Sequence, residues 1–88
     1  MPVISVFFGI IIRMWHDDHP PPHIHVSYQG FEALVEIGTG RISKGKLPVK
    51  AAQLVTSWCS SHYSELMANW QRGENFEPMQ MIQGADYD

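Results

Sequence analysis

The sequence is poor in cysteine and in charge. It has 88 residues with a single cysteine, Cys59, which rules out a disulfide within the chain and a multi-cysteine zinc site and suits a reducing cytoplasm. Charged residues make up 17% of the chain, and the formal charge of -3 argues against tight, nonspecific binding to nucleic acid. No apolar run approaches the roughly 20 residues that cross a bilayer, so we expect no membrane association and a cytoplasmic location.

Strand patterns fill the first half of the chain. Apolar and polar residues alternate on both sides of a hairpin turn at Gln29-Gly30. Gly9 divides the apolar N-terminal run into two strands joined by a tight turn, or into one strand with a bulge. The predicted strand regions are residues 3–14, 23–28, 31–37 and 41–44. A small antiparallel sheet of these segments, covered on one face by a helix, predicts an α+β fold.

A helical pattern follows the strands. Apolar groups recur at steps of three and four from Pro48 to Arg72, which predicts a long C-terminal helix packed on one face of the sheet. Ser60-Ser61 are suited to begin a second helix, so a long helix and a broken one both stay open here. We assign residues 1–82 to a single domain and expect residues 83–88 to form an acidic, flexible tail.

Four of the five histidines lie between His16 and His25, on either side of three consecutive prolines. On a strand, His23 and His25 project from the same face, so their imidazoles are expected to lie a few ångströms apart. The prolines stiffen the preceding loop, which can fold Asp18 or His19 over that face at low entropic cost. These residues are the candidate functional site.

In one interpretation the cluster performs acid–base chemistry on a phosphodiester. A neutral imidazole acts as the base and a protonated imidazole as the acid, basic side chains hold the phosphate, and no metal is required. The residues expected to carry catalysis are Asp18, His19, His23, His25 and Arg13. The residues expected to bind phosphate are Lys44 and Lys46.

Two alternatives use the same residues differently. In a metal-binding interpretation, a divalent, zinc-like ion is held by His19, His23 and His25, and Asp18 is a fourth ligand or orients an imidazole. In a structural interpretation, the histidines are partly exposed strand and loop residues and the prolines only shape a turn. The sequence leaves these interpretations open and, with them, whether the protein is an enzyme.

Several motifs closely resemble one small bacterial family. They are Phe8-Gly9-Ile10-Ile11-Ile12-Arg13-Met14-Trp15, Asp18-His19-x-Pro21-Pro22-His23-Ile24-His25, Tyr28, Gly45-Lys46-Leu47-Pro48, Trp58, His62, Glu65-Leu66 and Trp70. The family is the domain-of-unknown-function family numbered 4160, and the resemblance extends from about Met1 to Ile82. The family's motif maps onto the candidate site residues Asp18, His19, His23 and His25. Pro20 is an addition to that motif and is expected to stiffen the loop.

The resemblance implies a biological role. Members of this family are similar to toxin components of type II toxin–antitoxin pairs, typically encoded beside a small partner protein of another uncharacterised family, numbered 2442. We therefore expect a toxin that a small antitoxin-like protein neutralises, and the histidine site favours RNA or nucleotides as its target. The alternatives are a non-enzymatic binding module that pairs with such a partner, and a histidine-ligated metal-binding protein. The apolar N-terminal strand favours pairing with that partner or with a second copy in a homodimer.

Overall fold

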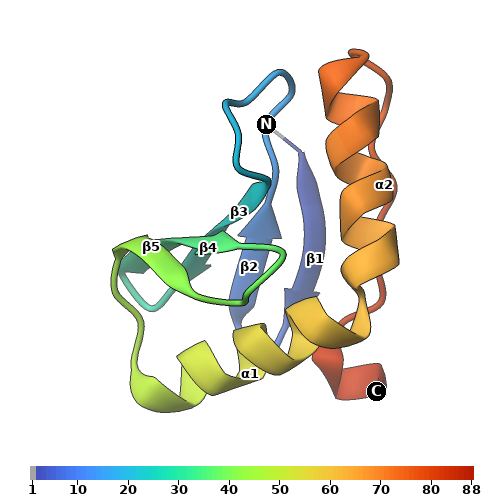
Figure 1. Ribbon diagram of the computed structural model, residues 1–88. Helices are drawn as coiled ribbons and strands as arrows, with labels where there is room; N and C mark the ends of the chain where they lie inside the picture. The colour runs from blue at the N-terminus through green and yellow to red at the C-terminus, as the bar shows by residue number, and fades with distance from the viewer. Residues whose placement is uncertain (1) are drawn as a thin grey trace.

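The computed structural model describes residues 2–88 and consists of a five-stranded antiparallel sheet followed by two helices (Figure 1). Strands that are neighbours in the sheet are also neighbours in the sequence, so every strand connection is local. The α+β class and the antiparallel sheet are therefore confirmed. In chain order the elements are β1 (Val3–Phe7), β2 (Ile10–Arg13), β3 (His23–Tyr28), β4 (Phe31–Glu36), β5 (Ile42–Gly45), α1 (Val49–Ser61), α2 (Tyr63–Glu74) and the short 3-10 helix η1 (Ala85–Tyr87).

Two-residue turns join β1 to β2 and β3 to β4. Phe8 and Gly9 have φ values of 52° and 76°, and Gln29 and Gly30 have φ values of 47° and 84°. Positive φ at both central residues matches the turn to the right-handed twist of the strands, and glycine adopts such values without strain. Gly9 therefore separates two strands, which is one of the two arrangements that the sequence predicts.

The expectation of one long helix over residues 48–72 is wrong. The chain leaves the helical conformation at His62, which has φ -116° and ψ 25°, so α1 ends at Ser61 and α2 begins at Tyr63. Figure 1 shows α1 crossing one end of the sheet and α2 running alongside β1. Each helix buries its own apolar stripe, and both stripes keep the same steps of three and four, so the periodicity passes through the break unchanged. Within residues 2–88, no helix combines the length and the apolar character needed to span a membrane.

The two faces of the sheet have different surroundings. One face packs against α1 and α2, where its isoleucines and valines join Trp58, Leu66 and Trp70 in the core. On the other face, the strand register aligns one residue from each strand in a row across the sheet. This open-face row consists of Val3, Arg13, His25, Leu34 and Lys44, each of them half-buried or exposed.

The chain after α2 returns along β1 to the helix junction. The Ile82 amide donates a hydrogen bond to the Ile4 carbonyl (2.7 Å) in β1. Residues 83–88, for which the sequence predicts a flexible tail, include η1 and the Gln83 carbonyl, which accepts a hydrogen bond from Trp58 Nε1 (2.9 Å). The C-terminal residues thus lie against both the sheet and α1.

Candidate functional site

The loop between β2 and β3, residues 14–22, is held at the C-terminal end of α2 (Figure 1). The Asp17 amide donates to the Gly73 carbonyl (3.0 Å), and His16 Nε2 donates to the Glu77 carbonyl (2.9 Å). Three prolines restrict the rest of the loop, because each fixes its own φ angle. The loop therefore presents the Asp18 side chain to β3 from a well-defined position.

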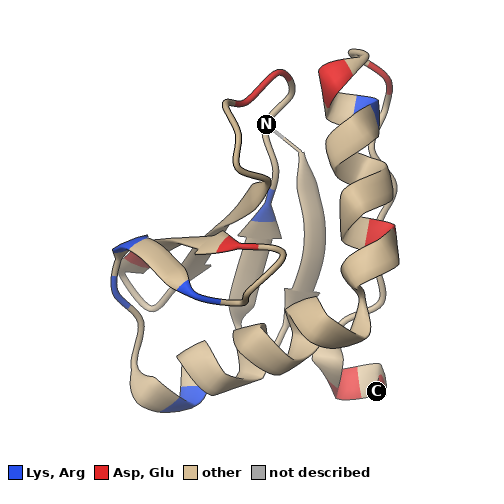
Figure 2. Ribbon diagram, viewed as in Figure 1, with Lys and Arg blue, Asp and Glu red and all other residues tan. Residues whose placement is uncertain are grey.

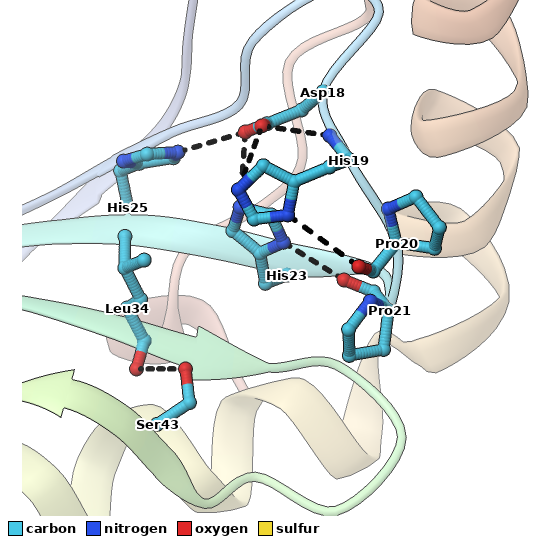
Figure 3. A network of polar contacts seen from close by, with 8 residues as sticks. All are labelled: Asp18, His19, Pro20, Pro21, His23, His25, Leu34 and Ser43. Carbon is cyan, nitrogen blue, oxygen red and sulfur yellow. Dashed lines mark hydrogen bonds and ion pairs between the residues drawn. The ribbon is translucent and has the colours of Figure 1, made fainter.

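Asp18 lies at the centre of the candidate site (Figure 3). Its Oδ2 atom is 2.9 Å from His23 Nε2 and 3.0 Å from His25 Nε2. Its Oδ1 atom accepts a hydrogen bond from the His19 amide (2.9 Å), which leaves Oδ2 for the two imidazoles. The rings of His23 and His25 project from the same face of β3, with centroids 5.2 Å apart. One carboxylate oxygen is thus shared between two imidazoles.

His23 is the buried member of the site, with a side chain that is 4% exposed. Its Nδ1 lies 2.8 Å from the Pro21 carbonyl, and because a carbonyl only accepts hydrogen bonds, Nδ1 carries a proton. The ring packs against Trp70 of α2, with centroids 5.4 Å apart. The short contact of Nε2 with Asp18 is not directed as a hydrogen bond, and this nitrogen is the one buried side-chain nitrogen or oxygen without a partner among residues 2–88. In the neutral ring, Nε2 therefore has a free lone pair.

His25 forms the solvent side of the site, with a side chain that is 30% exposed. Its Nε2 donates a hydrogen bond to Asp18 Oδ2 (3.0 Å). The rings of Trp15 and His25 pack edge to face, with centroids 5.8 Å apart. This packing restricts the imidazole while one side stays open to a ligand.

The pKa of Asp18 is lowered from its ordinary value. Burial by itself raises the pKa of this carboxyl, but hydrogen bonds from the His25 ring and the His19 amide lower it, as does the positive charge of His23 or His25 whenever either ring is protonated. These favourable contacts outweigh burial. Asp18 is therefore a carboxylate at neutral pH, able to accept a hydrogen bond or to bind a cation.

His19 lies beside this cluster. Its side chain is 78% exposed, and its Nε2 is 3.8 Å from Asp18 Oδ1, on the opposite oxygen from the one that the other two imidazoles share. Its ring packs over the His23 ring, with centroids 5.2 Å apart. Of the four residues of the sequence motif, the structure brings three together around one oxygen atom and leaves His19 at the rim.

The basic residues named from the sequence lie at different distances from the cluster. Arg13 is the β2 partner of His25 in the open-face row, and its Nη1 donates to Ser27 Oγ (3.3 Å). Lys44 lies in the same row two strands from His25, a separation of about 10 Å for two strand spacings. Lys46 lies beyond the end of β5, outside the row. Arg13 is therefore adjacent to the cluster, Lys44 is on the same face, and Lys46 is farther away.

A groove with a volume of about 350 Å³ begins at His25 and extends across β4 to β5. Ser27, Glu32, Leu34 and Lys44 are among the residues that line it. Figure 2 shows basic residues around β5 and the start of α1, whereas acidic residues are more frequent along α2 and near the C-terminus. The groove thus leads from the histidine cluster toward the more basic side of the molecule.

Asp18, His23 and His25 also form a set of potential metal ligands. Each offers one ligand atom, and the three atoms lie within 4.8 Å of one another. Cys59 cannot join such a set, because it lies in the core and burial raises the pKa of its thiol to about 12. A carboxylate and two imidazoles in this arrangement can transfer protons or hold a divalent cation.

Three further groups contact the site that the sequence did not assign to it: the Pro21 carbonyl, Trp15 and Trp70. A backbone carbonyl that fixes an imidazole has no signature in a sequence. Trp15 contacts the site from the loop and Trp70 from α2. In the sequence, the position of Trp70 in the helical periodicity predicted only a core residue. These contacts depend on how the loop and α2 meet in the folded protein.

A single histidine with two acidic partners lies at the junction of the two helices. His62 Nδ1 is 2.6 Å from Glu65 Oε1, and His62 Nε2 is 3.0 Å from both carboxylate oxygens of Asp88. Burial by itself lowers the pKa of His62, but the hydrogen bonds and negative charges of Glu65 and Asp88 raise it above its ordinary value. His62 therefore links the end of the chain to the helix junction through its charged form.

Comparisons with known proteins give one match. Residues 9–71 match the family described as Domain of unknown function (DUF4160). The matched region contains Asp18, His23 and His25, as well as the whole loop that brings them together. Neither a curated protein nor a solved structure matches the chain.

Proposed function

The chain belongs to the domain-of-unknown-function family 4160, and we propose that it is the toxin of a type II toxin–antitoxin pair that hydrolyses RNA or nucleotides. The resemblance of this family to such toxins supports the biological role, and the geometry around Asp18 supports the chemistry. In this proposal the protein acts in the cytoplasm, and a small antitoxin-like protein neutralises it by direct contact.

One observation carries the proposed chemistry: a single oxygen of Asp18 lies within 3.0 Å of two imidazoles, next to Arg13 on the open face of the sheet. A cluster of this kind can accept a proton from an attacking oxygen near neutral pH. The Arg13 guanidinium neutralises the negative charge that develops on the phosphate. In the hydrolysis, a water oxygen bonds to phosphorus while one ester P–O bond breaks. The cluster accepts the proton of the water, and the leaving oxygen takes a proton from solvent.

The groove beside His25 supports an extended substrate. It is open to solvent along the sheet, with Lys44 at its far end, where an ammonium group would contact a neighbouring phosphate of a bound strand. The overall charge of -3 limits binding away from this groove, because nonspecific affinity for RNA comes from phosphate neutralisation. The proposal therefore requires local recognition at the cluster and not a generally basic surface.

Growth of a bacterial host after induced expression tests the biological role. We expect the wild-type protein to arrest growth and His25→Ala to abolish the arrest, because His25 is the solvent-facing imidazole of the cluster. The matched control is His16→Gln, which removes an imidazole from the adjoining loop but keeps a donor for the Glu77 carbonyl. Equal arrest by the wild type and His25→Ala would refute a catalytic role for the cluster and favour the non-enzymatic binding module.

Cleavage of labelled RNA by the purified protein tests the chemistry. We expect the rate to fall by about 100-fold or more in His25→Ala and in Arg13→Ala, as for the loss of an acid–base group or of a charge-stabilising donor. Lys50→Ala is the control for Arg13→Ala, because it removes a basic side chain from the first turn of α1, outside the groove. Equal cleavage rates in Arg13→Ala and Lys50→Ala would contradict the role assigned to Arg13.

A further inference from the structure

We propose that Asp18, His23 and His25 bind one divalent transition-metal ion of the zinc class, through Asp18 Oδ2 and Nε2 of each imidazole. Binding of the ion stands on the geometry alone, whereas any part of the ion in hydrolysis rests on the proposed function. Three protein ligands leave coordination positions for water and for an oxygen of the substrate, as is typical of catalytic zinc sites.

The spacing of the donor atoms fits a coordination shell. Metal–ligand bonds of about 2.0–2.1 Å put neighbouring ligand atoms about 3.3 Å apart at tetrahedral angles and about 2.9 Å apart at right angles. Asp18 Oδ2 lies 2.9 Å from Nε2 of His23 and 3.0 Å from Nε2 of His25. Among the residues that the structure describes, this is the one set of three histidine, cysteine or acidic residues whose ligand atoms lie within 4.8 Å of one another.

The orientation of His23 Nε2 favours a metal ion over a proton as the group that lies between this nitrogen and Asp18 Oδ2. Because Nδ1 donates to the Pro21 carbonyl, Nε2 of the neutral ring is an acceptor, and it faces a second acceptor, Asp18 Oδ2, at 2.9 Å in a buried position. A cation in contact with both atoms relieves their repulsion. A proton on Nε2 does so poorly, since the nitrogen does not point along the line to Oδ2. The lone pairs of metal ligands converge on a point beside that line, which is compatible with a His23 Nε2 that does not point at Oδ2.

The surroundings orient His23 and Asp18 without using the atoms that face the ion, whereas His25 Nε2 gives up the hydrogen that it donates to Asp18 Oδ2 when the ion binds. The Pro21 carbonyl holds the His23 ring by Nδ1, and the His19 amide holds Asp18 by Oδ1, so neither contact uses the atom that faces the ion. Contacts of this kind fix the tautomer and direction of ligands in metalloproteins. Backbone groups of the proline loop thus orient these ligands, a role that carboxylates have around many metal-binding histidines.

The donor set selects the class of ion. Two imidazole nitrogens and one carboxylate oxygen suit zinc and its first-row neighbours, whereas magnesium and calcium prefer oxygen ligands alone. The Asp18 side chain is 15% exposed and that of His25 is 30% exposed, so an ion can enter from the groove side. His19 Nε2 is close to the opposite oxygen of Asp18 and is not required as a ligand.

Titration of tag-free protein, first stripped of metal with a chelator, tests the assignment. We expect one equivalent of Zn²⁺ to bind in calorimetry, Co²⁺ to give the visible absorption of a low-coordinate site, and Mg²⁺ not to bind. Asp18→Asn and His25→Ala should each weaken Zn²⁺ binding by at least about tenfold. His16→Gln and His19→Ala should bind Zn²⁺ as the wild type does. Loss of binding in His19→Ala would overturn the ligand set.

Other outcomes separate this inference from the proposed function. Failure of the wild-type protein to bind either Zn²⁺ or Co²⁺ would overturn the metal site, with no variant needed. If that metal-free protein still cleaves RNA, the proposed function stands without the ion. If both ligand variants weaken zinc binding but the wild-type protein does not cleave RNA, the metal site is supported and the proposed function is refuted.

Discussion

Replacing Asp18 by asparagine separates the stability of the site from its function. The asparagine Oδ1 still accepts the His19 amide hydrogen bond, and its NH₂ group takes the place of Oδ2, 2.9 Å from the free lone pair of His23 Nε2. This new hydrogen bond is bent, because Nε2 does not point along the line to that atom, so it contributes about 0.5 kcal/mol, and loss of the charge-assisted bond from the partly exposed His25 costs about 1.5 kcal/mol. We therefore expect the free energy of unfolding of Asp18→Asn to lie within about 1 kcal/mol of the wild-type value.

Asp18→Ala is the comparison for this prediction. It removes both oxygen atoms, so the His25 ring and the His19 amide lose their hydrogen-bond acceptor while His23 Nε2 stays unpaired, and the free energy of unfolding should fall by about 2–3 kcal/mol. Urea unfolding of the metal-free proteins near neutral pH, followed by the fluorescence of Trp70 and the other tryptophans, measures both changes. In a chain of this size, 1 kcal/mol moves the midpoint by roughly 1 M urea. Equal destabilisation by asparagine and alanine would show that no free lone pair faces Asp18.

Two further predictions concern the scaffold. The raised pKa of His62 means that its interaction with Asp88 stabilises the fold fully below about pH 6.5, and this stabilisation is lost as the pH rises through the higher folded-state pKa. Asp88→Asn should therefore lower the urea midpoint more at about pH 6 than at about pH 9. Because the acidic partners are partly exposed, this contribution should stay below about 1 kcal/mol. Gly45→Ala should reduce the free energy of unfolding by at least about 2 kcal/mol, because Gly45 has φ +80° and a Cβ there would meet the backbone of β4, whereas Gly38→Ala, which adds a Cβ in open space, should change it by less than about 0.5 kcal/mol.

Most of the sheet could be predicted from the sequence, because its determinants are local. The turn at Gln29-Gly30 has a local signal, Gly9 left a choice between a turn and a bulge, and antiparallel neighbours need no long-range pairing rule. The break at His62 could not be predicted from periodicity, since the apolar stripe continues in phase through it. Its determinants are distant in sequence: the packing of each helix against the sheet, and the contact of His62 with Asp88.

The centre of the candidate site was predictable for the same reason. His23 and His25 are two residues apart on one strand, and a proline-restricted loop brings Asp18 back over them. The sequence could not favour one interpretation of the cluster, because the argument depends on which nitrogen of His23 carries the proton. The Pro21 carbonyl determines that nitrogen, and the position of the loop depends on its hydrogen bond to Gly73 in α2.

Two departures from local stability lie at this one site, and they favour a functional interpretation over a structural one. A short chain has a narrow margin of stability, and a buried imidazole with an unpaired nitrogen beside a carboxylate reduces it. Gly73 in α2 reduces the margin again, since alanine would suit a helix better by about 1 kcal/mol. A Cβ there would stand 2.7 Å from Met79 Cε, the end of a flexible side chain, and 3.3 Å from the fixed Trp15 carbonyl oxygen of the loop. A turn shaped only by prolines needs neither feature. Both are explained if the fold holds Asp18 against two imidazoles for a ligand that contacts all three.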